Sequence, residues 1–560
     1  MGDMGTEVIV QADDEADEIE NEAESEMKIL VDQRDVDVDD DEVDTKEARK
    51  NTAALWRREL ALLMKLAVPL SATKFVVAIT RVVALSFVGR MSPRDDLAGA
   101  SLAGSVAGVS GYSLMVAFVG GLSTLGAQRF GAGDKNEVGR LTRLSVMLMI
   151  ALFSILILPL WLCSKALLTR LGQDENVSAK AAKFLWFNLP GVILFGLRQC
   201  IQTWAGVQYV VLPFTINAII TAAIALPVSY YMVKYDGYIG AAASISVTSV
   251  VQITLDFGYA WASGLHAKTQ LFKLPGKDAF RGVGRMLWLS LSSCIMLAEW
   301  WAGEITVMLA GRLASDDVVA NERTLAAMGI FGTMNGTLFM VPLGVVIAVS
   351  ARVGNEIGAG NPSTARRATV VAVALSTTVS LIDSTALILG RDIFASSFTN
   401  DSELASMLSG VVFGLALYHI IDGYCEAIVG SLEGCGRQAM MAPVVVFSHY
   451  AVGIPVSCFL GFYRHLGIVG LVTGRVCGKA CQAIIITVMG LRTDFREECR
   501  RAERLAALQR DKGGGTVSDS EVDGLQESLL PSDNYHKVRG CNAFGESSDD
   551  DDDNESDYLT

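Results

Sequence analysis

The sequence predicts an all-α membrane protein with twelve transmembrane helices, arranged as two parallel, pseudo-symmetric bundles of six helices. Two observations lead to this prediction. The 560 residues are 51% hydrophobic, and they contain repeated apolar stretches long enough to cross a bilayer as helices. Sequence markers also recur at a nearly constant offset along the chain, which indicates a duplicated unit.

Each apolar stretch is expected to form one spanning helix, because about 20 apolar helical residues cross the hydrocarbon core. The predicted spans are 59–88, 97–125, 141–163, 182–206, 208–233, 239–263, 285–311, 322–350, 367–393, 404–432, 440–462 and 466–491.

The formal net charge of −15 is concentrated at the two ends of the chain. Residues 1–50 carry 20 Asp and Glu against 5 Lys and Arg, and residues 496–560 carry 17 against 8. Neither segment has the apolar periodicity needed to offset the entropy of ordering a chain. We therefore predict four parts, which are a disordered acidic tail (1–53), an N-terminal lobe (54–270), a C-terminal lobe (271–495) and a second disordered acidic tail (496–560).

The loops on the side of the two tails are richer in basic residues than the loops on the other side. The residues concerned are Arg129, Lys135, Arg140, Arg143, Lys268, Lys273, Lys277, Arg281, Arg352, Arg366 and Arg367. Because basic loops stay in the cytoplasm, both tails are expected there. The membrane itself remains open, with the plasma membrane and a vacuolar or lysosome-like membrane as the two expectations.

The duplication is visible in short sequence markers. Residues 128–134 (QRFGAGD) resemble residues 355–361 (NEIGAGN) at an offset of 227, and Pro227 and Pro455 are 228 apart. A unit with an even number of spans enters the membrane in the same orientation twice, so the two copies are parallel. Transporters with this arrangement enclose a substrate site near the midplane between the repeats.

Ionisable residues within apolar spans are costly, so each is a candidate functional residue. The seventh span contains Glu299 and Glu304, which lie about 140° apart around a helix and do not share a narrow face. The tenth span contains Asp422, Glu426 and Glu433, whose spacings of four and seven place them on one face. Carboxylates so close together in a low dielectric cannot all ionise cheaply, and at least one should hold a proton. Glu299, Glu304, Asp422 and Glu426 are the predicted proton-coupling or substrate-binding groups.

Basic and aromatic residues offer alternatives to this interpretation. Some of the acids could simply pair with Lys74 and Arg81, which are seven apart on one face of the first span. Trp300, beside Glu299, could form an aromatic wall for organic cations, and packing or contact with lipid would explain it equally well.

Several motifs resemble the multidrug and toxic compound extrusion (MATE) transporters. The segments are residues 59–69 with 86–89, 121–133, 299–304, 350–362 and 430–438. In this order and spacing the set is specific, and it covers roughly residues 55–495. The resemblance implies a V-shaped pair of six-helix lobes. Trp300, Lys74, Arg81 and Gln128 are the candidate residues of the substrate cavity.

The resemblance implies exchange of organic cations or other metabolites for protons, with Na⁺ the less expected driving ion. It also assigns functional carboxylates to the positions of Glu299, Glu304 and Asp422. Two positions depart from the family pattern, because Thr333 replaces an acid of some animal members and Glu433 stands where arginine is usual. With Lys74 and Arg81, Thr333 weakens the case for a cationic substrate.

The expected function is therefore proton-driven export of organic solutes, with organic cations as the first substrate class. Efflux of organic anions or carboxylates is an alternative, and flipping of lipid-linked glycans is another. An enzyme is not expected, because no nucleotide-binding loop, metal-ligand cluster or nucleophile–base motif is visible. The expected partners are small organic substrates and the lipid bilayer, with no nucleic acid and no cofactor other than the proton gradient, and the chain is expected to be monomeric.

Overall fold

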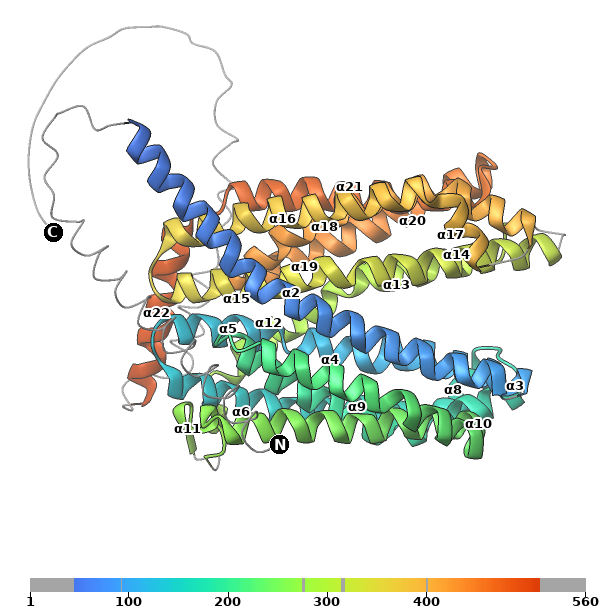
Figure 1. The fold of residues 1–560 in the computed structure, drawn as a ribbon, viewed down its shortest axis with the longest axis horizontal. Coiled ribbons are helices and arrows are strands. Elements are labelled where there is room, and N and C mark those ends of the chain that lie inside the picture. The colour runs from blue at the N-terminus through green and yellow to red at the C-terminus, as the bar shows by residue number, and fades with distance from the viewer. Residues whose placement is uncertain (1–44, 92, 274–276, 314–317, 399–400, 514–560) are drawn as a thin grey trace, which may run out of the picture. The chain divides into compact units, whose positions relative to one another are not determined.

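The computed structural model describes residues 45–91, 93–273, 277–313, 318–398 and 401–513, and all its regular elements are helical (Figure 1). The chain divides into two compact units, Met1–Glu503 and Arg504–Thr560. Every spanning helix belongs to the first unit. Most of the two predicted tails, residues 1–44 and 514–560, lies outside the described residues.

The first half of the chain supplies the helices of the N-terminal lobe. These are α2 (Thr45–Met91), α3 (Arg94–Ala107), the π-helical turn η1 (Gly108–Tyr112), α4 (Ser113–Phe118), α5 (Gly120–Gly131), α6 (Lys135–Leu152), the π-helical turn η2 (Phe153–Ile157), α7 (Leu158–Leu162), α8 (Ser164–Arg170), α9 (Glu175–Gly206), α10 (Leu212–Ala262) and α11 (Leu265–Lys268).

The second half supplies the C-terminal lobe, after the 3₁₀ turn η3 (Lys277–Phe280). Its helices are α12 (Val283–Met296), α13 (Ala298–Ala310), α14 (Val318–Leu338), α15 (Met340–Gly358), α16 (Pro362–Leu389), α17 (Arg391–Phe398), α18 (Ser402–Gly434), α19 (Gln438–Val446), the π-helical turn η4 (Phe447–Gly453), α20 (Ile454–Cys458), the π-helical turn η5 (Phe459–Tyr463), α21 (Gly467–Leu491) and α22 (Phe495–Gly513).

The described helices confirm the twelve predicted spans. Eleven helical segments are long and apolar enough to cross a membrane, and one of them, α10, has 51 residues. At Gly237 the backbone of α10 takes φ 58° and ψ −136°, a conformation that glycine adopts far more easily than other residues. The break divides α10 into two spans, which brings the described total to twelve.

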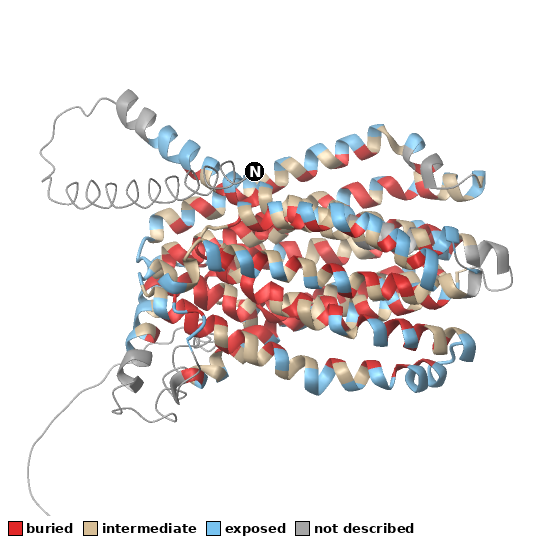
Figure 2. Ribbon diagram, turned by 60° about the horizontal axis from the view of Figure 1, so that its bottom comes forward, coloured by how far each residue is buried: buried red, intermediate tan, exposed pale blue. Residues whose placement is uncertain are grey.

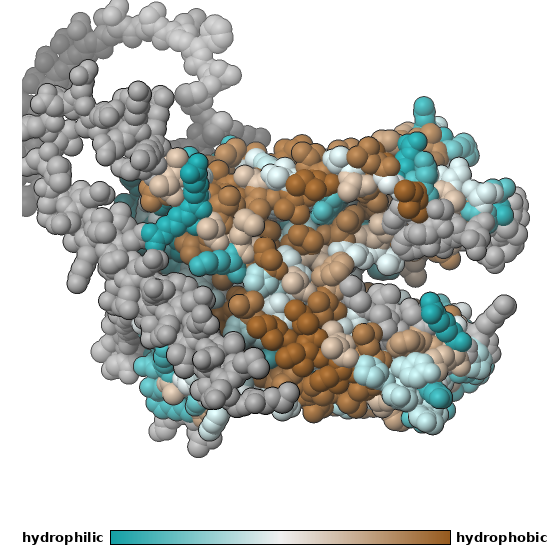
Figure 3. Space-filling view, in the orientation of Figure 1, coloured by the Kyte–Doolittle hydropathy of each residue, from teal (hydrophilic) through white to brown (hydrophobic). Residues whose placement is uncertain are grey.

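Burial and hydropathy follow the pattern expected of a bundle in lipid. Buried residues concentrate along the interior of the bundles, and exposed ones lie mainly on their outer faces and at their ends (Figure 2). A broad apolar band covers the middle of the visible surface, with hydrophilic residues toward both ends (Figure 3). Many large apolar side chains are exposed on the spans, among them Ile155, Met308 and Leu389 at 73–82%, as contact with lipid tails requires.

The predicted start of the C-terminal disordered tail, residue 496, is wrong for the residues that the structure describes. Helix α22 covers Phe495–Gly513, and Glu498 is 3% exposed because the guanidinium of Arg437 binds its carboxylate at 2.5 Å. This ion pair fixes the first turns of α22 against the start of α19. At the other end, α2 begins at Thr45, earlier than the predicted lobe boundary at 54.

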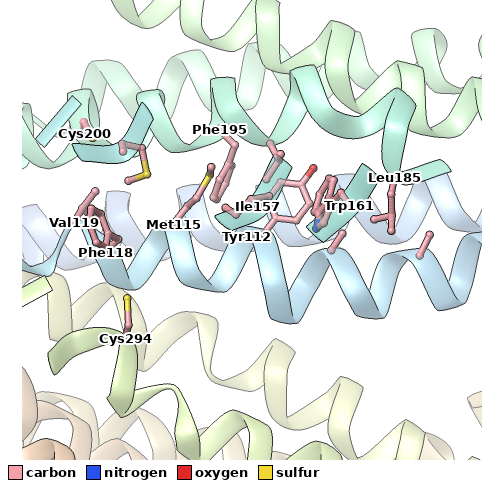
Figure 4. Close-up of a cluster of buried hydrophobic side chains, with 14 of the residues drawn as sticks. Tyr112, Met115, Phe118, Val119, Ile157, Trp161, Leu185, Phe195, Cys200 and Cys294 are labelled. Atoms are coloured by element: carbon pink, nitrogen blue, oxygen red, sulfur yellow. The ribbon is translucent and has the colours of Figure 1, made fainter. Parts of the chain in front are cut away.

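The first helix of each half packs against both lobes: α2 lies against α10 as well as α15, and α12 lies against α19 as well as α5. Met286, Leu289 and Cys294 of α12 belong to the apolar core of the N-terminal lobe, and Figure 4 shows Cys294 reaching toward Phe118 and Val119. In the same way, Leu63, Leu66 and Ala67 of α2 share a core with Val345, Ala348 and Val349 of α15. The predicted boundary at 270–271 therefore separates the two halves in sequence, but side chains from both halves share the same apolar cores.

The two lobes meet at the end where α5 and α15 come together, and the contact is symmetric. The side-chain amide of Gln128 donates to the carbonyl oxygen of Gly434 at 3.0 Å, and that of Asn355 donates to the carbonyl oxygen of Val207 at 3.0 Å. Both the donors and the acceptors are separated by the repeat offset of 227 residues. Each copy of the duplicated motif therefore supplies an equivalent hydrogen bond between the lobes.

At the opposite end the lobes separate. Figure 3 shows a wedge-shaped opening between them at the end where α3 and α14 lie. This confirms the predicted V shape for the unit that contains the spans. The orientation predicted from the basic loops, with both tails in the cytoplasm, places this opening on the exoplasmic side.

A single cysteine offers a test of this orientation. Cys163, between α7 and α8, is exposed, whereas the other described cysteines are buried or half-buried. An impermeant maleimide added from the exoplasmic side is expected to label Cys163, and Cys163→Ser should abolish the labelling. Labelling of Cys163 only after the cytoplasmic side is opened would reverse the topology.

Candidate functional site

A cluster of charged side chains lies inside the C-terminal lobe. Glu299 comes from the first turn of α13, and Asp422 and Glu426 come from one face of α18. Carboxylate oxygens of these three residues all lie within 4.8 Å of one another. The structure thus brings together three of the four predicted acids.

The basic partner of this cluster is Lys479 on α21. Its ammonium nitrogen lies 2.6 Å from Asp422 Oδ1, 2.9 Å from Glu426 Oε1, and 2.8 and 2.9 Å from the two carboxylate oxygens of Glu299. The side chains of Lys479 and Asp422 are 0% and 3% exposed, and those of Glu299 and Glu426 are 13% and 14%. Two carboxylates therefore reach open space while the lysine is enclosed.

Two glycines set how closely α21, the helix of Lys479, packs against its neighbours. A Cβ on Gly474 would overlap the backbone of Ser457, and a Cβ on Gly478 would lie 3.0 Å from Gly453 Cα. Since larger residues cannot approach so closely, these glycines let α21 lie directly against η4 and α20.

Further polar groups complete the surroundings of Glu299. The hydroxyl of Tyr418 donates to Glu299 Oε1 at 2.7 Å. Nε2 of His449 lies 2.7 Å from Gln482 Oε1 and 3.6 Å from Glu299 Oε2. His449 belongs to the π-helical turn η4, and such turns often occur at functional sites.

The charges of the cluster do not balance when all three acids are ionised. One ammonium offsets one of three carboxylates, which leaves an excess of two negative charges in a largely buried site. Buried charges without partners are costly, so the cluster gains from binding protons or a cationic molecule. Release of these protons restores the negative charge, and the site can therefore alternate between two charge states.

The other predicted site residues lie elsewhere. Glu304 is exposed on α13, as expected from its angular separation from Glu299. Trp300 is 44% exposed, and its ring packs edge-on against that of Phe339, with the ring centroids 5.5 Å apart. The amide of Gln128 is bonded within the contact between the lobes.

The remaining positions singled out in the sequence do not join the cluster either. Lys74 is half-buried on α2, and the side chain of Arg81 lies outside the described residues. Thr333 donates to the carbonyl oxygen of Gly329 within α14. Glu433 is half-buried near the end of α18.

Several functional candidates were missed in the sequence. Lys479 and Arg475 lie four residues apart within an apolar span, which is the signal that singled out the acids. The guanidinium of Arg475 stacks over the rings of Phe331 at 5.1 Å and Tyr418 at 5.3 Å. Asp256, in the N-terminal lobe, is fully buried and accepts a hydrogen bond from Asn217 at 3.0 Å.

The fold and this site define a class of protein, namely a duplicated helical carrier with an ionisable site in one lobe. The MatE family model matches residues 69–231 and 292–459. This chain belongs to the MatE family, and it is accordingly a multi-pass membrane transporter of the multidrug and toxin efflux class, not an enzyme.

Individual relatives agree with this assignment. Protein DETOXIFICATION 51 of Arabidopsis thaliana is 30% identical over 481 residues, covering 84% of this chain and 88% of the relative. Protein DETOXIFICATION 49 of the same plant is 29% identical over 475 residues, covering 84% and 92%. Among solved structures, the eukaryotic MATE transporter AtDTX14 superposes with a TM-score of 0.74 at 25% identity, covering 80% of this chain and 99% of that one.

Proposed function

We propose that this transporter exports organic solutes in exchange for protons, which bind to the carboxylates of Glu299, Asp422 and Glu426. The observation that carries the proposal is the excess of acid in the buried cluster, where one lysine faces three carboxylates. A change of two protons converts this site from negative to neutral. The exchange needs such a change in charge, because only a difference between the two states can couple the two fluxes.

The direction of transport follows from the two charge states. With the cytoplasmic side open, the deprotonated cluster attracts an organic cation. With the exoplasmic side open, as here, protons bind, the negative charge falls and the cation leaves. The negative charge of the deprotonated cluster therefore favours organic cations as the substrate class.

Reconstituted protein can test the exchange directly. In proteoliposomes with an acidic interior, the wild type is expected to accumulate a fluorescent organic cation such as ethidium. Glu299→Gln and Asp422→Asn should each strongly reduce this uptake, because each variant leaves one excess negative charge in the cluster where the wild type has two. The matched control is Glu175→Gln, whose carboxylate is 75% exposed in an ion pair with Lys165 outside the cluster.

Two results would count against the proposal. Uptake that persists in both Glu299→Gln and Asp422→Asn would remove these acids from the coupling. Transport of an organic anion, with no transport of the cation, would replace the substrate class by the anionic alternative.

A further inference from the structure

The ammonium group of Lys479 occupies the centre of the carboxylate cluster. An ammonium has three N–H donors, and Lys479 donates to both carboxylate oxygens of Glu299 at 2.8 and 2.9 Å and to Glu426 Oε1 at 2.9 Å. It also forms an ion pair with Asp422 at 2.6 Å, and the side chain is fully buried. The lysine is held as closely as a bound cation would be.

The same oxygens would otherwise suit an inorganic cation. Oxygen atoms of the three carboxyl groups lie within 4.8 Å of one another, a spacing at which one ion could contact them all. Carboxylates are the preferred ligands of hard cations. In the structure this central position is taken by the nitrogen of Lys479.

We propose that Lys479 is a built-in cation that bars inorganic cations from the cluster and restricts its driving ion to the proton. The inference rests on the proposed function, because it concerns the ion that drives the same exchange. A proton needs only one carboxylate oxygen, and it can bind on the side turned away from the ammonium. A sodium ion needs several of these oxygens at once, and the ammonium already holds them.

The surroundings of Lys479 support a fixed position. The charged or titratable groups close to the cluster are the three acids, Tyr418 on α18 and His449 on η4, with Arg475 one turn earlier on α21. The backbone of α21 is held against η4 and α20 at Gly474 and Gly478. The lysine therefore stays in place without a substrate.

Thermal unfolding of the purified protein can test this role without any transport assay. Melting temperatures are compared in sodium chloride and in potassium chloride at equal ionic strength. The wild type and Lys479→Arg, which keeps the charge, are expected to melt at the same temperature in both salts. Lys479→Met is expected to melt at a higher temperature in sodium, because sodium binds the vacated position and stabilises the folded state.

The double variant Lys479→Met/Glu426→Gln covers the case in which the single variant does not fold, since it carries one negative charge less. It should also melt at a higher temperature in sodium than in potassium. Equal melting temperatures in both salts for these variants would overturn the inference, as would a wild type that sodium stabilises as strongly as Lys479→Met.

The outcome is separable from that of the proposed function. A sodium-dependent melting temperature in Lys479→Met, together with no pH-driven uptake by the wild type, would retain the role of Lys479 and reject proton exchange. Normal pH-driven uptake by the wild type, with no sodium effect in Lys479→Met or Lys479→Met/Glu426→Gln, would retain proton exchange and reject the role of Lys479.

Discussion

Gly358→Ala is expected to open the contact between the lobes at the cytoplasmic end. A Cβ at Gly358 would overlap the backbone carbonyl oxygen of Gln128, and a Cβ at Gly131 would overlap that of Asn355. A backbone carbonyl cannot rotate away as a flexible side chain can. Overpacking of this kind typically costs about 1–3 kcal/mol, which would shift the ratio of closed to open cytoplasmic ends about 5- to 150-fold.

A native cysteine can report this opening. Cys435 is 5% exposed, and it follows Gly434, whose carbonyl oxygen accepts from Gln128. Burial raises the pKa of the Cys435 thiol, so it should react slowly with maleimide in the wild type. In Gly358→Ala, site-resolved mass spectrometry should show faster modification of Cys435.

The matched control is Gly258→Ala on α10, where an added Cβ meets no atom within 4 Å. Its labelling rate at Cys435 should equal that of the wild type. If Gly358→Ala and Gly131→Ala both leave the labelling rate unchanged, these glycines do not hold the cytoplasmic end closed.

Arg352→Met is expected to destabilise the protein by about 3–5 kcal/mol, the usual effect of removing one partner of a buried ion pair. The guanidinium binds both carboxylate oxygens of Glu59 at 2.8 and 3.1 Å, and it also pairs with Glu356. These two acids are 4% and 12% exposed and would lose their counter-charge. Nη1 of Arg352 also donates to the hydroxyl of Tyr209 at 3.2 Å, and this bond ties α15 to the loop before α10.

Thermal unfolding in detergent would measure this effect. Arg352→Lys should recover only part of the stability, because an ammonium cannot form the paired bonds that a guanidinium forms with a carboxylate. Arg352→Met/Glu59→Gln should be more stable than Arg352→Met alone, since it removes one of the two uncompensated charges. A change of less than about 0.5 kcal/mol in Arg352→Met, the range of ordinary surface substitutions, would contradict the assigned role.

The sequence predicted the depth of the charged residues in the membrane better than it predicted their partners. Hydropathy locates a span, and spacing shows that Asp422 and Glu426 share a face, whereas Glu299 and Glu304 do not. Which base meets these acids depends on how α21 packs against η4 and α18. Lys74 and Lys479 look equivalent in the sequence, and only the ion pairs of the folded structure identify Lys479 as the partner.

Local helix geometry was also beyond the reach of the sequence. The π-helical turn at Phe447–Gly453 turns His449 toward Glu299, although the apolar pattern there predicted a regular span. The repeat was more informative, because the two copies of the motif lie together in the structure. The duplicated motif was visible as similar residues, and the structure shows that Gln128 and Asn355 make equivalent hydrogen bonds across the contact.

The bridging of the two lobes by their first helices bears on the origin of the duplicated chain. Part of α2 and part of α12 complete an apolar core of the other half, so a single half would leave part of that core uncovered. A six-helix ancestor with this packing would have been complete only as a parallel homodimer whose first helices packed across the interface. Fusion of two such genes would then have preserved a pairing that already existed, and it would have freed one copy to concentrate the acids while the other kept few.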